Sequence, residues 1–321
     1  MAIVKDVDIL FDLKISIISA IKNGCTTIDK IYLYLSKKYT KEQIKYCLNL
    51  LLVEDESIVR NDYYYGESNY ELVSERQKKS SYTKNYRNFI DDNPNKKKKI
   101  LLISDTHLGN NELENMILIN TVYEYAKQEN CDFAFHLGDL FEGNNSKEIN
   151  TFIEKYPNYI KTVCLLGNHD QQFNNLKFLN AYNDSFNVYE TSRWSTKLNN
   201  NDIHLSHRFY ISWLIEDQKI NCIDDIDEVD DFLSNDFRVL ISGHLHQGII
   251  YIKNNYQNKE TIYLGVPSLS NTNINKSCAY IMTIDNDIID ISVLTVSNNY
   301  EIKEIDNIEL KDQPKFLKKV Y

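Results

Sequence analysis

Acidic and imidazole side chains end several apolar runs of this sequence. Residues 101–109 read LLISDTHLG, so a run of aliphatic residues gives way to Asp105 and His107, and four later runs end on residues of the same kinds. The full set is Asp105, His107, Asp139, Asn168, His169, Asp170, His207, His244 and His246. Carboxylate, amide and imidazole groups together suit manganese, iron, zinc or nickel, whereas calcium prefers oxygen ligands alone. The pattern predicts a site for two divalent ions, about 3.5 to 4 Å apart.

The runs before these residues are typical of buried β-strands. ILLISD, DFAFHLGD, TVCLLGNHD, IHLSH and RVLISGHLH are rich in β-branched and aliphatic residues, and helical patterns separate the first three. The strand ends of an α/β sheet are where ligands bind. Gly138, Gly167 and Gly243 lie beside the polar residues, and we expect them to let the backbone turn sharply so that the side chains converge.

Together these motifs, D-x-H, GD, GNHD, a lone His and GHxH, resemble those of the calcineurin-like metallophosphoesterase superfamily over about residues 100–270. The resemblance implies an α/β fold, a four-layer α/β/β/α sandwich, and a metal-dependent phosphoesterase. It implies one ion held by Asp105, His107, Asp139 and His246, and a second held by Asp139, Asn168, His207 and His244. Asp139 would bridge the two ions, and manganese is the first choice of metal.

The resemblance also assigns roles to residues near the expected ligands. His169 resembles the residue that protonates the departing oxygen, and Asp170 would orient that imidazole and raise its pKa. The family's lone histidine is usually followed by Gly, but Arg208 follows His207 here, so His204 is kept as an alternative ligand. Arg208 is a candidate for binding substrate phosphate, although a surface salt bridge is an equal alternative.

The substrate is less well defined by sequence. DTHLG, GDLFEG and GNHD resemble the exonuclease subunits of double-strand-break repair complexes, although lipid-precursor hydrolases share GDLFE. A DNA nuclease is therefore the first hypothesis. The alternative is a phosphodiesterase or phosphomonoesterase acting on nucleotides, cyclic nucleotides or other small substrates, with the N-terminal domain used for a homo-oligomer. A third hypothesis, a regulatory DNA-binding protein with a degenerate site, is disfavoured because no metal position is missing.

The N-terminal part has the pattern of three helices and a hairpin. Apolar residues recur at helical spacing over 9–21, 28–35 and 44–52, and two β-like runs flank residues 63–68. Thr26 with Asp29, and Thr40 with Gln43, have capping-box spacing. This arrangement resembles a winged-helix domain, which binds DNA in some proteins and mediates dimerisation in others. The expected DNA-contacting residues are Lys41, Lys45, Asn49 and Arg60.

Four segments follow from this reading. They are a winged-helix-like domain (1–75), a basic polar linker (76–99), the phosphoesterase domain (100–300) and a charged C-terminal tail (301–321). Within the third segment, strand-like runs without helices follow residue 248.

The bulk composition of the 321 residues is that of a globular protein, with 42% hydrophobic residues. The six cysteines form no CxxC pair, which argues against a zinc finger or a disulfide framework. The sequence shows neither a secretion signal nor a long apolar run, so we expect a cytoplasmic protein with no membrane contact. The first 95 residues are balanced in charge and the rest carries the net −10, part of which bound divalent ions would offset.

Overall fold

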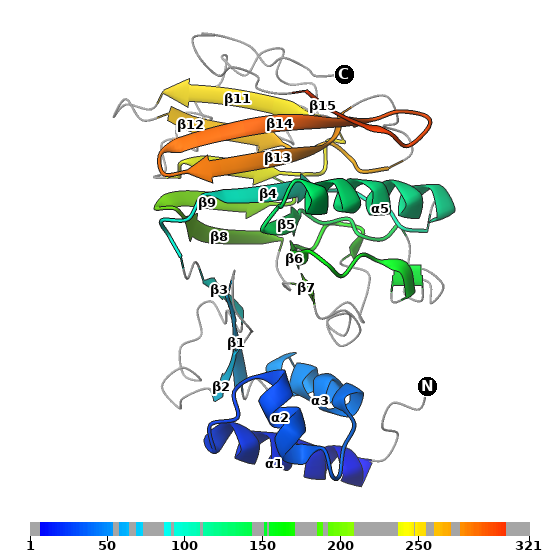
Figure 1. Cartoon of the computed structure of the whole chain (residues 1–321), viewed down its shortest axis with the longest axis vertical. Helices are drawn as coiled ribbons and strands as arrows, with labels where there is room; N and C mark the ends of the chain where they lie inside the picture. The colour runs from blue at the N-terminus through cyan, green and yellow to red at the C-terminus, as the bar shows by residue number, and fades with distance from the viewer. Residues whose placement is uncertain are drawn as a thin grey trace. The chain divides into compact units, whose positions relative to one another are not determined.

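The chain forms two compact units in the computed structural model (Figure 1). One takes in Met1–Asn93, and the other takes in Pro94–Leu176 and Ser185–Tyr321. The structure describes residues 7–53, 58–63, 69–72, 87–90, 93–109, 112–142, 151–152, 154–170, 185–188, 192–208, 237–246, 248–254, 260–270 and 277–305. Residues 64–68, between the two β-like runs, and most of the expected C-terminal tail lie outside these residues.

The N-terminal unit contains the three expected helices, α1 (Val7–Lys22), α2 (Ile28–Leu35) and α3 (Lys41–Val53). Their apolar faces form one core. Thr40 and Gln43 make the expected capping box at α3, since each backbone N–H donates to the other's side chain. At α2 the N-cap is Thr27 and not Thr26, because the Thr26 hydroxyl is hydrogen-bonded to Asn69.

Three strands complete this unit. β1 (Ile58–Tyr63) and β2 (Asn69–Leu72) form the expected antiparallel hairpin. β3 (Arg87–Ile90) pairs in parallel with β1, although residues 76–99 were expected to be a linker. A four-residue strand in a charged, polar stretch has too few apolar residues to stand out, so only the backbone pairing with β1 shows that it exists.

The second unit is built on a seven-stranded sheet in the order β15-β14-β13-β4-β5-β6-β7. The strands are β4 (Lys98–Ile103), β5 (Phe133–His136), β6 (Lys161–Cys164), β7 (Phe186–Val188), β13 (Ser277–Asp285), β14 (Ile288–Val296) and β15 (Ile302–Ile305). The first four run parallel, and β13 to β15 form an antiparallel meander. Because β15 pairs with β14, the start of the expected tail at 301–321 is part of the sheet instead.

A five-stranded sheet, in the order β11-β12-β10-β9-β8, forms the second layer. Its strands are β8 (Arg193–Leu198), β9 (Asn201–Ser206), β10 (Val239–Ser242), β11 (Ile249–Asn254) and β12 (Glu260–Gly265). The rings of Phe135 on β5 and Trp194 on β8 pack edge to face with centroids 5.7 Å apart, so the two sheets share a core. The result is the mixed α/β fold that the sequence predicts.

Helix α5 (Glu112–Gln128) covers the other face of the large sheet (Figure 1). Its buried side contributes Leu118, Ile119 and Val122, and the hydroxyl of Tyr123 lies 2.8 Å from that of Thr162 on β6. Of the four expected layers, the described residues show this helix and the two sheets. No helix in the part of the chain described is long and apolar enough to cross a bilayer.

Candidate metal centre

Strand register brings the polar residues to one edge of the sheets. Ile103 pairs with His136 and His136 pairs with Cys164, so β4, β5 and β6 end at the same level. In the other sheet, Ser206 pairs with Ser242, so β9 and β10 also end together. β4, β5 and β6 are parallel to one another, and β9 is parallel to β10, so the loops after the strands of each set leave from the same edge of the sheet.

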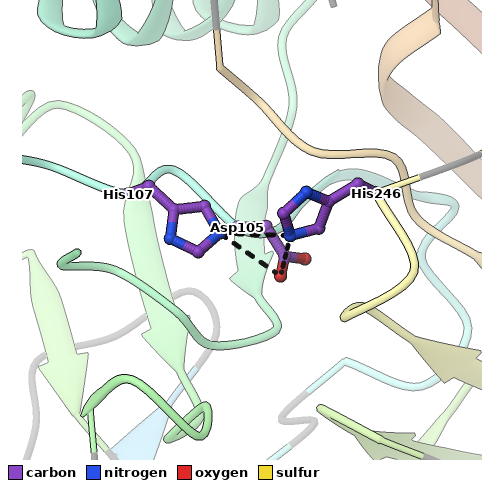
Figure 2. Close-up of side chains that lie close together, drawn as sticks. All are labelled: Asp105, His107 and His246. Atoms are coloured by element: carbon purple, nitrogen blue, oxygen red, sulfur yellow. Dashed lines mark hydrogen bonds and ion pairs between the residues drawn. The ribbon is translucent and has the colours of Figure 1, made fainter. Parts of the chain in front are cut away.

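Asp105, His107 and His246 form the first group of candidate ligands (Figure 2). Asp105 Oδ1 lies 3.3 Å from Nε2 of His246 and 3.9 Å from Nε2 of His107, and the two imidazole nitrogens are 3.1 Å apart. Asp105 is fully buried, and Oδ1 accepts no hydrogen bond from any described residue. A buried carboxylate oxygen facing two imidazole nitrogens is a donor set that fits a divalent transition metal.

Asp139, His207 and His244 form the second group. His207 Nε2 lies 3.4 Å from Asp139 Oδ2 and 2.9 Å from Asn168 Oδ1. His207 Nδ1 is 2.8 Å from the carbonyl oxygen of Leu137 and must donate to it, since that oxygen can only accept. In the neutral ring the lone pair therefore lies on Nε2, the atom that faces the other candidate ligands.

Asp139 connects the two groups. Its Oδ1 accepts the backbone N–H of His169 at 2.9 Å, while its Oδ2 faces His207. Asp139 also forms a third group with His107 and His169, whose ligand atoms all lie within 4.8 Å of one another. A carboxylate that faces both sets of imidazoles is the group expected to bridge two cations.

Backbone conformation sets these residues apart from the rest of the described chain. Ten described residues other than glycine have positive φ, of which four are Asn and one is Tyr. The remaining five are Asp105, His107, Asp139, His244 and His246. Such conformations are costly for most side chains and are often retained at functional sites. The strained positions are thus concentrated on the expected ligands.

Gly138, Gly167 and Gly243 allow the candidate ligands to lie close together in two ways. Gly138 has φ +105°, so it makes the sharp turn expected of it. Gly167 and Gly243 do not have positive φ, so their role is close approach and not the expected turn. A Cβ on Gly167 would lie 2.0 Å from Asp139 Oδ1, and one on Gly243 would lie 2.0 Å from Ser104 Oγ.

The role expected for Asp170 is wrong. Its carboxylate is buried and accepts backbone N–H groups of Leu140, Phe141 and Gly167, so it fixes the loops and does not orient the His169 ring. Burial, which outweighs these hydrogen bonds, raises the pKa of Asp170 to about 6. The sequence could not show this, because adjacent side chains on a turn need not point the same way.

Glu142 is the residue that sequence reasoning missed. His169 Nδ1 lies 3.2 Å from the Glu142 carbonyl oxygen, and Glu142 Oε2 lies 2.6 Å from His107 Nδ1. The carbonyl oxygen favours a His169 ring with its proton on Nδ1 and its lone pair on Nε2, whereas the contact between Glu142 and His107 Nδ1 is a charge contact without hydrogen-bond geometry. Glu142 is the last acid of GDLFEG, so its position three residues after Asp139 was the available signal.

His207 and not His204 belongs to the cluster. His204 Nδ1 is 2.7 Å from Ser195 Oγ on the neighbouring strand, and its ring stacks on Phe237. His207 lies one residue beyond the end of β9, where the chain turns into the site. Arg208, which follows it, is partly buried, and its role in binding substrate phosphate stays a prediction.

His136 is a packed histidine inside the second unit. Gly138 N–H donates to its Nδ1 at 3.2 Å, so the neutral ring carries its proton on Nε2, which lies 3.0 Å from Thr106 Oγ1. The Thr106 hydroxyl in turn donates to the Leu140 carbonyl. Burial lowers the pKa of His136 to about 3, so it stays neutral and links the loops after β4 and β5.

The carboxyl and imidazole groups of the cluster shift one another's pKa values. Burial alone would raise the pKa values of Asp105 and Asp139, but His246 and His207 outweigh it and lower the pKa of each carboxyl. Burial would also lower the pKa of His207, but Asp139 and Asp105 raise it to about 9. Protonated imidazole thus neutralises the carboxylates, a role that a metal cation can take over.

The expected DNA-contacting residues of the N-terminal unit are only partly described. Lys41 Nζ forms an ion pair with Asp29 at 2.8 Å, and Lys45 is half-buried on α3. The side chains of Asn49 and Arg60 lie outside the described residues.

Comparison with known proteins gives one match to a family. The model of the calcineurin-like phosphoesterases matches residues 98–265, and a search of curated proteins found no significant match. Among solved structures, a predicted phosphoesterase from Streptococcus pneumoniae is 18% identical, with a TM-score of 0.36 over 66% of this chain and 99% of that one. The phosphoesterase Yfce from E. coli is 15% identical, with a TM-score of 0.36 over 65% and 98%. Vacuolar protein sorting 29 from Cryptosporidium parvum is 12% identical, with a TM-score of 0.41 over 66% and 99%.

Proposed function

The chain belongs to the calcineurin-like phosphoesterase family and is a metal-dependent phosphoesterase, and from this premise we propose that it hydrolyses phosphodiester bonds with two divalent ions, with DNA as its substrate. The observation that carries the two-ion proposal is the position of Asp139, which faces both groups of imidazoles. A site for a single ion would not need a second complete set of ligands on the far side of this carboxylate.

The donor sets fit two ions as follows. Asp105, His107 and His246 would hold one ion, Asn168, His207 and His244 would hold the other, and Asp139 would contact both. When bound, the ions supply positive charge for the phosphate oxygens and lower the pKa of a bound water. Manganese is the first ion to test, with iron, zinc and nickel as alternatives.

The chain's own residues would complete the reaction. His169 holds its Nδ1 proton toward the Glu142 carbonyl, which leaves Nε2 to carry a proton to the departing oxygen. Its ring is partly exposed, so a substrate can reach it. Asp170, through three backbone N–H groups, keeps the loops that carry Asp139 and His169 in place.

Two sequence features support DNA as the substrate. The motifs DTHLG, GDLFEG and GNHD resemble those of double-strand-break repair exonucleases. The N-terminal unit has three helices followed by a hairpin, the element order of winged-helix domains, which in some proteins bind DNA. In this proposal the unit delivers the nucleic acid, and Lys45, Asn49 and Arg60 contact its phosphates.

One observation favours a second candidate, hydrolysis of a nucleotide or another small phosphate ester. Lys41, an expected DNA contact, is paired with Asp29, and the first 95 residues have no net charge. A unit without excess positive charge gains little from phosphate contacts.

The test is a substrate panel assayed with manganese. Purified protein is incubated with single- and double-stranded DNA, RNA, cyclic nucleotides, phosphomonoesters and bis(p-nitrophenyl) phosphate, with Asp139→Asn as the inactive control. Hydrolysis of DNA by the wild type alone supports the proposal. Cleavage of bis(p-nitrophenyl) phosphate without any cleavage of DNA contradicts the DNA assignment and supports the second candidate.

A further inference from the structure

The turn that carries Asp105 and His107 is buried and strained. The two residues have positive φ, +50° and +43°, and Thr106 between them is fully buried. A backbone of this shape persists only where the surrounding structure fixes it. Because the turn is buried, its peptide N–H and C=O groups need hydrogen-bond partners within the protein. These partners therefore identify the groups that hold the two candidate ligands in place.

The backbone N–H groups of the turn are bound by the loop after β5. Asp105 N–H donates to the Gly138 carbonyl oxygen at 3.0 Å, and His107 N–H donates to the Asp139 carbonyl oxygen at 3.1 Å. These bonds join two segments that both carry candidate ligands. They fix one side of the turn, so its conformation also depends on the groups that bind its carbonyl oxygens.

Side chains from two other segments bind those carbonyl oxygens. Ser268 Oγ, beyond the end of β12, donates to the Asp105 carbonyl oxygen at 2.7 Å. Asn115 Nδ2, on α5, donates to the carbonyl oxygens of Thr106 at 3.2 Å and His107 at 3.4 Å. An amide nitrogen carries two hydrogens, so one Asn115 side chain can serve two successive peptide groups. A serine or threonine hydroxyl has only one hydrogen to donate.

Asn115 occupies a core-facing position of α5. It lies four residues before Ile119 and seven before Val122, which are both fully buried, and it is itself only 1% exposed. Apolar residues usually fill such positions, because burial of an amide costs free energy that its hydrogen bonds must offset. The bonds to the Thr106 and His107 carbonyl oxygens are what asparagine supplies here and an apolar residue does not.

We propose that Asn115 is a positioning residue of the metal centre, which keeps His107 in the conformation that directs its imidazole toward Asp105 and His246. The inference rests on the metal centre of the proposed function, but it does not depend on the substrate. The φ of His107 sets the direction in which its side chain leaves the backbone. Without the Asn115 amide the turn relaxes, and His107 Nε2 moves away from Asp105 Oδ1. Asn115 thus acts through the backbone and not as a ligand.

Replacement by leucine tests this role. Leucine is close to asparagine in size and suits a buried helix position, but its side chain donates no hydrogen bond. In isothermal titration with manganese, Asn115→Leu should weaken one binding step by roughly 10- to 100-fold and leave the other nearly unchanged. Asn120→Leu makes the same change at a half-buried position of α5, and this matched control should bind manganese as the wild type does.

Asn115→Ala separates positioning from packing. Alanine leaves space in which water can bind the two carbonyl oxygens, so manganese binding should weaken less than in Asn115→Leu. If Asn115 only filled space, leucine would replace it well and alanine would leave a cavity. A larger loss of affinity in Asn115→Ala than in Asn115→Leu therefore overturns the positioning role.

The remaining outcomes separate this inference from the proposed function. Circular dichroism and thermal unfolding of each metal-free variant establish that it is folded at the temperature of the titration. If Asn115→Leu does not fold, the loss of one binding step in Asn115→Ala decides. Wild-type affinity in the folded variants, or equal weakening of both binding steps, overturns the role of Asn115 and leaves the metal centre standing. A wild type that binds no manganese overturns the metal centre, and this inference with it.

Discussion

Replacement of Glu142 tests how the first candidate ion is held. The Glu142 carboxylate lies 2.6 Å from His107 Nδ1, while His107 Nε2 faces Asp105 and His246. We predict that Glu142→Ala weakens binding of one divalent ion, because His107 loses the negative charge that lies beside its Nδ1. Glu142→Gln removes the same charge and should weaken binding to a similar extent.

The magnitude follows from the contact. A charge contact with a partly exposed partner contributes up to about 1 kcal/mol. The Glu142 side chain is 34% exposed and His107 is largely buried, so we expect the high end of this range, about 1 kcal/mol. At about 1.4 kcal/mol per factor of ten, the affinity for that ion should fall roughly fivefold.

Isothermal titration with manganese measures both sites in one experiment. Glu142→Ala should weaken one binding step and leave the other unchanged, because the Glu142 carboxylate lies beside His107, which belongs to the first group of candidate ligands. Turnover at saturating manganese should fall less than turnover at limiting manganese. If both binding steps keep wild-type affinity, or if both weaken equally, Glu142 does not support His107 as a metal ligand.

Three further predictions concern the same centre. Asp139→Asn should abolish turnover and reduce the amount of bound metal, which elemental analysis of the purified protein measures. Full metal content with normal turnover would contradict the bridging role of Asp139. His169→Ala should lower kcat by about 10² to 10⁴ with unchanged metal content, because a general acid is lost; wild-type kcat would exclude that role. Burial would lower the pKa of His207, but Asp139 and Asp105 raise it to about 9. A metal ion binds only the neutral imidazole, so the proton on His207 must leave when the metal binds. The apparent metal affinity should therefore rise with pH, by up to about tenfold per pH unit for each proton released, until the pH reaches about 9. Titrations in buffers of different ionisation enthalpy count these protons, and an affinity that is flat between pH 6.5 and 8.5 would argue against the assignment.

The strands that carry the site could be read from the sequence. β4, β5, β6 and β10 are short apolar runs, which parallel strands buried on both faces produce, whereas β9 alternates buried and half-buried residues over most of its length. The ligand types follow directly after them, so their convergence follows from the parallel arrangement of α/β sheets. His207 could be preferred over His204 for the same reason, since it is the one beyond the strand end.

Other elements were missed because their signal is not local. β3 and β15 are four-residue strands in polar stretches, and pairing with β1 and β14 defines them. The orientation of Asp170 depends on three backbone N–H groups from two loops, and no residue pattern records such contacts. Glu142 was overlooked because its partner His107 lies 35 positions earlier in the chain.

Close approach was also hidden from the sequence. Gly167 and Gly243 were expected to be turn residues, but the atoms of Asp139 and Ser104 fill the space where a Cβ would lie. The glycines could thus be recognised in the sequence as part of the site. Their structural role could not be predicted, because glycine serves both in sharp turns and where other atoms approach the backbone closely.

The most direct measurement is a crystal structure of the protein grown with manganese, with anomalous diffraction recorded to locate the metal. We expect two anomalous peaks about 3.5 to 4 Å apart, with Asp139 between them. One peak should lie among Asp105, His107 and His246, and the other among Asn168, His207 and His244. A single peak, or two peaks that do not share Asp139, would contradict the central claim.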